Sequence, residues 1–360
     1  MFNLGFITQE PLEKDGRFFG QSSRVMPIIY NAFKENSNVQ MHNLSMNDRS
    51  AMAKLMLKFM KAYGTSAEKK ALGPNMMARA FAEFDIIERF LRGPVCDLPK
   101  LDALVLDLRS VGAPYDFWEW CLVYYYLYCE PVKKIYIFDC DDLFPSRLTC
   151  VKQMREDILK RSVVMKGTAR GELGYEYLSH RWFIPEMAKI DHPRFLPSTD
   201  LSYAGYDYGR RAMFDKYLTD IDLGVNIMGK YPEEYIAKHS ALTFTGVTDW
   251  HKVIDTYNDS VGVLQLIRKR YIPIGMVPTR LWETAGAHTL SFLPSEYPDK
   301  EQWGLPECFV SSRAELEEKV HFYKSHPFER RELIEKNYAL FAKDKPADIC
   351  NIIINHFNAL

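Results

Sequence analysis

The amino-acid sequence predicts an α/β protein made of two Rossmann-like, doubly wound domains that face a central cleft. The chain has 360 residues, which at roughly 150 residues per domain indicates about two domains. Short apolar runs alternate with longer amphipathic segments, as they do in parallel sheets with crossover helices. A proline-rich stretch containing Pro185, Pro193 and Pro197 separates two such series.

The first series predicts a parallel sheet within residues 1–180. The strand candidates are short apolar runs at Phe2–Thr8, Val39–Asn43, Ala103–Leu108, Lys134–Phe138 and Ser162–Met165. Helices are expected between them at Asp48–Tyr63 and Asn75–Leu91, and in the second of these the apolar residues recur near a period of 3.6.

The second series predicts another parallel sheet, within residues 198–343. Its strand candidates are Leu201–Ala204, Leu223–Met228, Gly262–Leu266 and Thr289–Leu293. Two helices are expected late in this domain, at Arg313–Lys324 and Phe328–Phe341. A final amphipathic segment, Pro346–Phe357 within residues 344–360, follows well after the last predicted strand and is free to pack elsewhere.

Composition limits the partners and the surroundings of the chain. Forty-six Lys and Arg oppose 47 Asp and Glu, so a polyanion must be met by a local basic face rather than by the overall field. Seven cysteines without a CxxC spacing fit a reducing cytoplasm. We expect no membrane span, because no apolar run reaches about 18 residues. The nine histidines show no zinc-ligand spacing.

An acid and a cation come together at a predicted helix start, in Thr279–Glu283. Arg280 and Glu283 are three residues apart and therefore share one helix face. The guanidinium can bind phosphate oxygens, and the carboxylate can accept hydrogen bonds from both ribose hydroxyls. The alternative interpretation is a surface ion pair.

Glycines follow two other strand candidates. Leu201–Ala204 leads into Gly205 and then into Arg210 and Arg211, which suggests a diphosphate site with close backbone approach. The alternative is an ordinary glycine turn followed by a basic first helical turn. A second corner of this kind is Phe244–Gly246.

Three carboxylates follow the strand candidate Lys134–Phe138, at Asp139, Asp141 and Asp142. An aspartate in this position can act as a general base. Aspartates also end strands and cap helices routinely, so a structural role is the alternative. Carboxylate oxygens suit a hard cation, but the spacing matches no EF-hand and does not require Mg²⁺ or Mn²⁺.

The segment Thr279–Arg313 resembles the bacteriophage DNA β-glucosyltransferases. Their Thr-x-Arg-x-Trp-Glu-Thr segment corresponds to Thr279–Thr284, which lacks one residue between Thr and Arg, and their Phe-Tyr-Val-x-x-Arg-Ala-Glu-Leu run corresponds to Phe309–Leu316. Tyr203–Gly205 with Gly209 and Arg211, and Phe244–Gly246, match further motifs in the same order. The resemblance is specific over about residues 200–340 and loose before them.

The resemblance implies a GT-B architecture in which the second domain holds a UDP-sugar and the C-terminal helix crosses back to the first domain. Glu283 would bind the ribose, and Arg280 and Arg211 the diphosphate, with Gly205 close to it and Arg210 beside them. Thr245, Gly246 and Val247 would belong to the UDP-sugar site, with the nucleobase recognised through Val247 or Thr248, although the residues after Gly246 differ from those of the family.

The resemblance also implies a catalytic aspartate, because Tyr136–Phe138 resembles the strand that precedes it in the family. Asp139 or Asp141 would be that base, with Asp141 favoured. The family's Ser-Ser-Glu appears here as Ser22-Ser23-Arg24, so a carboxylate near the acceptor or the sugar is missing. We expect Ser23 and Arg24 on the acceptor side.

The implied activity is inverting transfer of a sugar, glucose first, from its UDP-sugar to the hydroxymethyl group of 5-hydroxymethylcytosine flipped out of double-stranded DNA. Candidate DNA-phosphate contacts are Arg268–Arg270, Arg147 and Lys166–Arg170. We expect a monomer in the cytoplasm of the phage's host. One alternative is another donor, such as UDP-arabinose, or another acceptor; a second is a non-catalytic DNA- or nucleotide-binding module.

Overall fold

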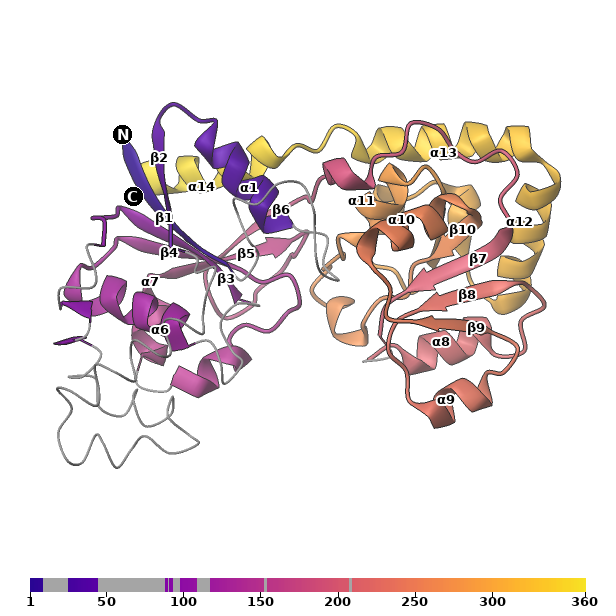
Figure 1. Ribbon diagram of the computed structural model, residues 1–360, viewed down its shortest axis with the longest axis horizontal. Helices are drawn as coiled ribbons and strands as arrows, with labels where there is room; N and C mark the ends of the chain where they lie inside the picture. Colours follow the sequence, from indigo (N-terminus) through magenta and orange to yellow (C-terminus); the bar gives the residue numbers. More distant parts are fainter. Residues whose placement is uncertain are drawn as a thin grey trace.

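The chain forms two lobes, each built on a six-stranded sheet whose neighbouring strands run parallel (Figure 1). The computed structural model describes residues 1–8, 25–44, 88–89, 91–92, 98–108, 117–151, 154–206 and 209–360. Within these residues, the α/β fold class predicted from the sequence is confirmed.

The first sheet has the strand order β2-β1-β3-β4-β5-β6. Its strands are β1 (Phe2–Ile7), β2 (Val39–Asn43), β3 (Ala103–Asp107), β4 (Lys134–Phe138), β5 (Ser162–Gly167) and β6 (Tyr177–His180). Its helical segments are α1 (Val25–Lys34), α6 (Phe117–Tyr124), η2 (Tyr125–Cys129), η3 (Ser146–Val151) and α7 (Arg155–Arg161). Every residue of β3 and β5 is buried, as expected of central strands covered on both faces.

The second sheet has the strand order β12-β11-β10-β7-β8-β9. Its strands are β7 (Thr199–Ala204), β8 (Val225–Met228), β9 (Thr243–Gly246), β10 (Ser260–Leu264), β11 (Leu290–Pro294) and β12 (Phe309–Val310). Its α-helices are α8 (Arg211–Leu218), α9 (Glu233–Lys238), α10 (Trp250–Asn258), α11 (Arg280–Gly286), α12 (Arg313–Ser325) and α13 (Pro327–Phe341). Short 3₁₀ helices are η4 (Glu186–Ala188), η5 (Lys269–Tyr271), η6 (Lys300–Gln302) and η7 (Pro306–Cys308).

The last helix, α14 (Pro346–Asn358), returns to the first lobe and packs against α1 and β6 (Figure 1). The rings of Phe2 and Phe357 stack with centroids 4.3 Å apart. The Tyr136 hydroxyl lies 3.0 Å from His356 Nδ1. The expected crossing of the C-terminal helix is therefore confirmed.

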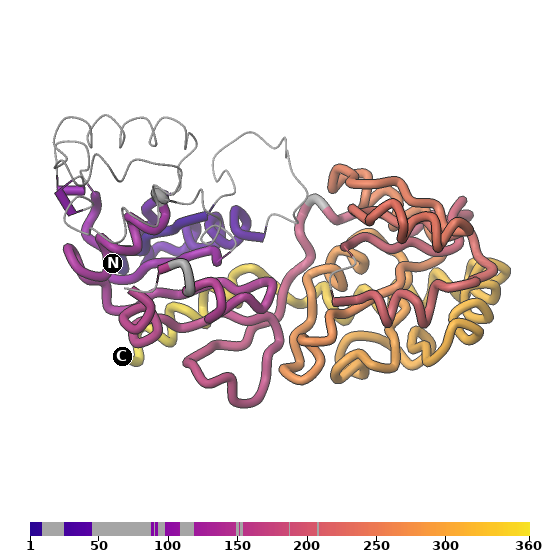
Figure 2. The backbone as a smooth tube through the Cα atoms, turned by 90° about the horizontal axis from the view of Figure 1, so that it is seen from below, coloured from indigo at the N-terminus to yellow at the C-terminus, as the bar shows by residue number. Residues whose placement is uncertain are grey.

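Two segments connect the lobes, one after β6 and one between α13 and α14, and both run through the middle of the molecule in Figure 2. Arg181 of the first segment and Asp344 of the second form an ion pair at 2.8 Å. Trp282 Nε1 also donates to Asp344, at 2.8 Å. These contacts tie both connections to α11.

Each strand predicted from the sequence is present, with ends displaced by a few residues. No end moves by more than two residues: β5 ends later than predicted, β7 begins earlier, β8 begins later, and β10 spans Ser260–Leu264. The edge strands β6 and β12 were not predicted. The predicted helix Asp48–Tyr63 lies outside the described residues, as does the helix Asn75–Leu91 except for a few helical residues at its end. In the described part of the chain, no helix has the length and apolarity needed to cross a membrane.

Candidate active site

A cavity of about 470 Å³ lies between the lobes, at the carboxyl ends of β7, β8 and β9. The second lobe supplies most of its lining, and the first lobe adds Val25, Cys140 and Asp141. In open parallel sheets this edge is where ligands bind. The cavity therefore defines the candidate active site.

The start of α11 places both of its charged side chains on the cavity. Thr279 precedes the helix, but its hydroxyl donates to Glu283 Oε1 at 3.1 Å instead of capping the backbone. Glu283 is buried, and Arg280 lies over the Tyr203 ring, 5.1 Å from its centroid. Arg280 Nη1 is buried without a hydrogen-bond partner among the described residues. These positions do not fit the alternative of an exposed surface ion pair.

Three glycines line up where β7, β8 and β9 end. Gly205 N donates to Met228 O and Gly229 N donates to Gly246 O, both at 2.8 Å. A Cβ on Gly205 would come within 2.8 Å of Arg280 Nη2, and one on Gly229 within 2.0 Å of Gly205 O. Their φ angles of +156° and +152° also suit glycine. Gly229 was not singled out from the sequence, because no motif surrounds it.

Arg210 and Arg211 occupy different environments. Arg210 is buried and lines the cavity, donating to the carbonyls of Leu266 at 3.2 Å and Tyr206 at 3.1 Å. Burial, with the nearby guanidinium groups of Arg280 and Arg268, lowers the pKa of Arg210. Arg211 is exposed on α8, with its guanidinium 5.4 Å from the Tyr235 ring centroid, and it does not line the cavity.

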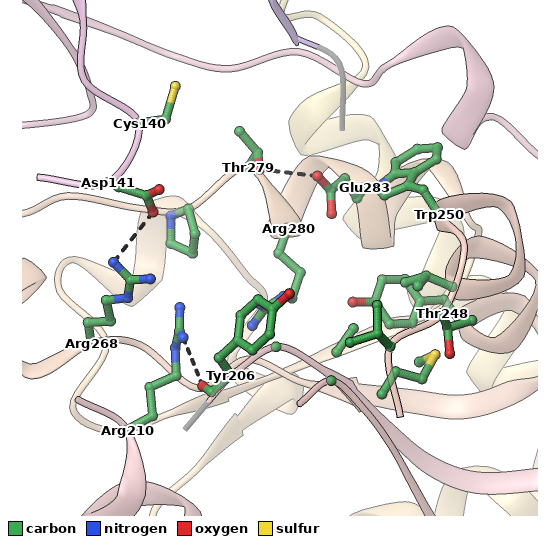
Figure 3. Close-up of a pocket in the computed structure, with 18 of the residues that line it drawn as sticks. Cys140, Asp141, Tyr206, Arg210, Thr248, Trp250, Arg268, Thr279, Arg280 and Glu283 are labelled. Atoms are coloured by element: carbon green, nitrogen blue, oxygen red, sulfur yellow. Dashed lines mark hydrogen bonds and ion pairs between the residues drawn. The ribbon is translucent and has the colours of Figure 1, made fainter. Parts of the chain in front are cut away.

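The end of the cavity near Glu283 is largely apolar. Trp250 and Thr248 lie at this end in Figure 3. Other residues that line the cavity from β8, α10 and the loop after β9 are Met228, Val247, Val253 and Tyr257. Of the predicted corner, Val247 lines the cavity, whereas Thr245 is exposed and donates to Asn226 Oδ1 at 3.2 Å.

Asp141 lies at the opposite end, on the loop after β4, with Arg280 between it and Glu283 (Figure 3). Its side chain is 41% exposed, and its Oδ1 is 3.4 Å from Arg268 Nη1. The Tyr271 hydroxyl donates to the same oxygen at 3.3 Å. Arg268 and Tyr271 belong to the second lobe, so these contacts cross the cleft. Sequence reasoning had named Arg268 only as a DNA contact and had not named Tyr271.

Asp139 is buried inside the first lobe. It accepts hydrogen bonds from Leu143 N at 2.8 Å and Phe144 N at 3.0 Å, and pairs with the buried Lys166 at 2.7 Å. Burial opposes the charge on Lys166, but the carboxylates of Asp139 and Asp142 outweigh it and raise the pKa of Lys166. The prediction that Lys166 contacts a DNA phosphate is therefore wrong, because its side chain has no exposed surface.

The predicted acceptor-side residues Ser23 and Arg24 lie outside the described residues. Among the residues that the structure describes, no group of three or more His, Cys, Asp or Glu could hold a metal ion. Positive charge in the described cavity comes from the guanidinium groups of Arg210, Arg268 and Arg280.

Solved structures with the same two-lobed architecture include glycosyltransferases. Bacteriophage T4 β-glucosyltransferase, solved with its UDP-glucose substrate, matches with a TM-score of 0.59 over 99% of this chain and 98% of its own, at 15% identity. The chain has the GT-B fold. Sucrose-phosphate synthase from Thermosynechococcus elongatus matches this GT-B protein over 100% of both chains with a TM-score of 0.57, at 10% identity.

A third GT-B match is an O-GlcNAc transferase from Thermobaculum terrenum, with a TM-score of 0.53, 9% identity and coverage of 99% of this chain and 67% of that one. No protein-family model and no curated protein matches the sequence. The resemblance to the phage β-glucosyltransferases is thus confirmed by a structural match over nearly the whole length of both chains.

Proposed function

We propose that this GT-B protein is an inverting glycosyltransferase that moves a sugar from a UDP-sugar to the hydroxymethyl group of a modified cytosine in DNA. The observation that carries the proposal is the pair on α11. Arg280 has a buried nitrogen that no described residue hydrogen-bonds, Glu283 lies one helical turn away, and both line one cavity.

The charged and apolar ends of the cavity suggest one orientation for a bound UDP-sugar. The diphosphate is placed near Arg280 and Arg210, because burial and mutual repulsion of these guanidinium groups are relieved when an anion binds between them. Glycines at Gly205 and Gly229 let the backbone approach the phosphates. The ribose hydroxyls then meet Glu283, and the base enters the apolar end near Trp250.

This placement puts the sugar at the end of the cavity where Asp141 lies. Asp141 is proposed as the base instead of Asp139, because Asp139 is already bonded to Lys166 and to two backbone amides within the first lobe. Asp141 takes the proton of the acceptor hydroxyl as the hydroxyl oxygen bonds to the anomeric carbon. The bond from that carbon to the phosphate oxygen breaks, and its electron pair leaves with UDP.

The arginines assist the reaction through charge. The leaving diphosphate gains negative charge in the transition state, so cations held in place along the cavity stabilise the transition state more than the ground state. Arg211 is not assigned to the diphosphate, because it lies outside the lining. A divalent cation is not required by this arrangement of charges.

A hydroxymethylated DNA acceptor is proposed from the sequence resemblance, and a structural match described as the DNA-modifying enzyme β-glucosyltransferase supports a DNA acceptor. The modified base must leave the duplex to reach Asp141, at a cost of a few kcal/mol. Arg170 and Arg270 are 57% and 46% exposed, and we propose them as phosphate contacts that would exchange their present partners Asp299 and Asp142 for DNA.

The test is mass measurement of hydroxymethylcytosine DNA after incubation with a panel of UDP-sugars, including UDP-glucose and UDP-arabinose, with and without Mn²⁺. A mass increment of one hexose or one pentose per modified base supports transfer and identifies the donor class. Tight UDP binding without any increment on this DNA contradicts the proposal and favours another acceptor or a non-catalytic binding module.

A further inference from the structure

The loop after β4 is held from both lobes. On its own side, Asp139 and Asp142 bind Lys166, at 2.7 Å and 2.5 Å. From the other lobe, Arg270 approaches Asp142 Oδ2 at 3.8 Å and donates to the Asp141 carbonyl. The position of Asp141 therefore depends on the segment Arg268–Tyr271 of the second lobe.

Two side chains of that segment converge on one oxygen of Asp141. Arg268 Nη1 lies 3.4 Å from Asp141 Oδ1, and the Tyr271 hydroxyl donates to Oδ1 at 3.3 Å. Asp141 Oδ1 thus takes part in one ion pair and one hydrogen bond with the second lobe. Holding Oδ1 in this way leaves Oδ2 to accept a proton.

Tyr271 is firmly placed as a hydrogen-bond donor. Its side chain is fully buried, and its carbonyl accepts from Met276 N at 3.1 Å. Burial, and then the charge of Asp141, raise the pKa of Tyr271 to about 12, so the hydroxyl keeps its proton at neutral pH. Lys269 N also donates to Gly209 O, which fixes the segment beside Arg210, one of the arginines proposed to bind the UDP-sugar.

We propose that Arg268 and Tyr271 are positioning residues that hold Asp141 by Oδ1 across the cleft and present Oδ2 to the acceptor hydroxyl. Asp141 and the arginines proposed to bind the UDP-sugar are then correctly placed relative to each other only while the two lobes keep these contacts. This inference rests on the proposed function: the proton passes from the acceptor hydroxyl to Oδ2 while the new bond to the anomeric carbon forms and UDP leaves.

Tyr271→Phe is the main test, because it removes the hydroxyl and keeps the buried ring. We expect kcat to fall about tenfold, the size of a lost hydrogen bond to a charged group, with the donor KM and the UDP Kd changed less than twofold. Tyr217→Phe is the matched control: this tyrosine is also fully buried and its hydroxyl bonds Glu296 and Val310 outside the cavity. It should leave kcat unchanged.

Substitutions of Arg268 that keep or remove its positive charge provide a second test. Arg268→Gln should lower kcat at least tenfold, and Arg268→Lys should recover most of the loss. A normal kcat in Tyr271→Phe, a loss in Tyr217→Phe of the same size, or equal losses in Arg268→Lys and Arg268→Gln would overturn the positioning role.

Asp141→Asn separates this inference from the proposed function. If Asp141→Asn keeps full turnover, the base assignment and the positioning role both fail. If it abolishes turnover while Tyr271→Phe behaves like wild type, only the positioning role fails. UDP binding by calorimetry and the thermal midpoint show that each variant is folded.

Discussion

The two sides of the cleft carry opposite charge and are built differently. The first lobe presents a carboxylate, Asp141, on a loop anchored beneath by the buried Asp139–Lys166 pair. The second lobe presents the guanidinium groups of Arg210, Arg268 and Arg280, and burial together with the charges of the other two lowers the pKa of Arg210. The difference shows where each lobe's stabilising contacts go: Asp139 is neutralised within its own lobe by Lys166, whereas Asp141 meets Arg268 across the cleft.

The same contrast separates two aspartates only two residues apart. Asp139 has no exposed side-chain surface, and Asp141 is 41% exposed at the cavity. One carboxylate holds its lobe together, and the other is open to a substrate. Exchanging a carboxylate for an amide at each position measures this difference directly.

Asp141→Asn should give the largest effect, a loss of turnover of about a thousandfold, because it removes the proposed general base without changing the shape of the side chain. Sugar transfer is measured by mass, and UDP affinity and the thermal midpoint should stay near the wild-type values. Turnover within tenfold of wild type would assign the base elsewhere.

Asp139→Asn should instead destabilise the protein by about 3 kcal/mol, because it removes the fully buried partner of Lys166 and leaves only the partly exposed Asp142 to balance its charge. Urea unfolding of the first lobe measures this. A stability equal to that of wild type, combined with lost turnover, would reverse the roles given to Asp139 and Asp141.

Arg280→Ala tests the basic side, and Arg211→Ala is its matched control. Removing Arg280 should lower kcat/KM about a hundredfold, the range seen when one buried donor to a developing anion is lost. Arg211→Ala should change it less than about threefold, because that side chain is exposed on α8. Equal losses would place both arginines on the diphosphate, as the sequence resemblance implies.

His180, at the end of β6 in the first lobe, shows the effect of burying a titratable group that no carboxylate among the described residues pairs with. Burial, only partly offset by a contact with the Arg181 carbonyl at 3.2 Å, lowers the pKa of His180 to about 4. Between pH 6.5 and 4 the unfolded chain binds this proton and the folded one does not, so stability falls as the pH falls through that window.

At pH 5 this amounts to about 2 kcal/mol relative to pH 7. Unfolding midpoints measured from pH 7 to 5 should therefore fall more steeply in wild type than in His180→Gln. Parallel curves for the two proteins would show that the site accommodates the charged ring.

The fold was largely predictable from the sequence because central parallel strands are buried on both faces and appear as continuous apolar runs, as in β3 and β10. The edge strands β6 and β12 were missed because they lack such an apolar run. Tyr177–His180 is only partly buried, and Phe309–Val310 has just two residues. Neither gives a run long enough to recognise.

The candidate site was only partly predictable. Arg280 and Glu283 could be paired because helical periodicity places residues three apart on one face. Lys166 was misassigned because its carboxylate partner lies 27 positions earlier in the chain. Tyr271 and Gly229 were missed because their neighbours at the cavity come from other strands and, for Tyr271, from the other lobe.

The local sequence thus determined the two parallel sheets, the pairing of Arg280 with Glu283 on α11, and the glycines at two strand ends. Strand burial, helical period and backbone freedom all act over a few residues. Only the tertiary structure decided which of Asp139 and Asp141 is buried, which of Arg210 and Arg211 reaches the cavity, and what holds Asp141 across the cleft. Those outcomes depend on charge pairs and packing between segments more than twenty residues apart, and such partners meet only after the chain has folded.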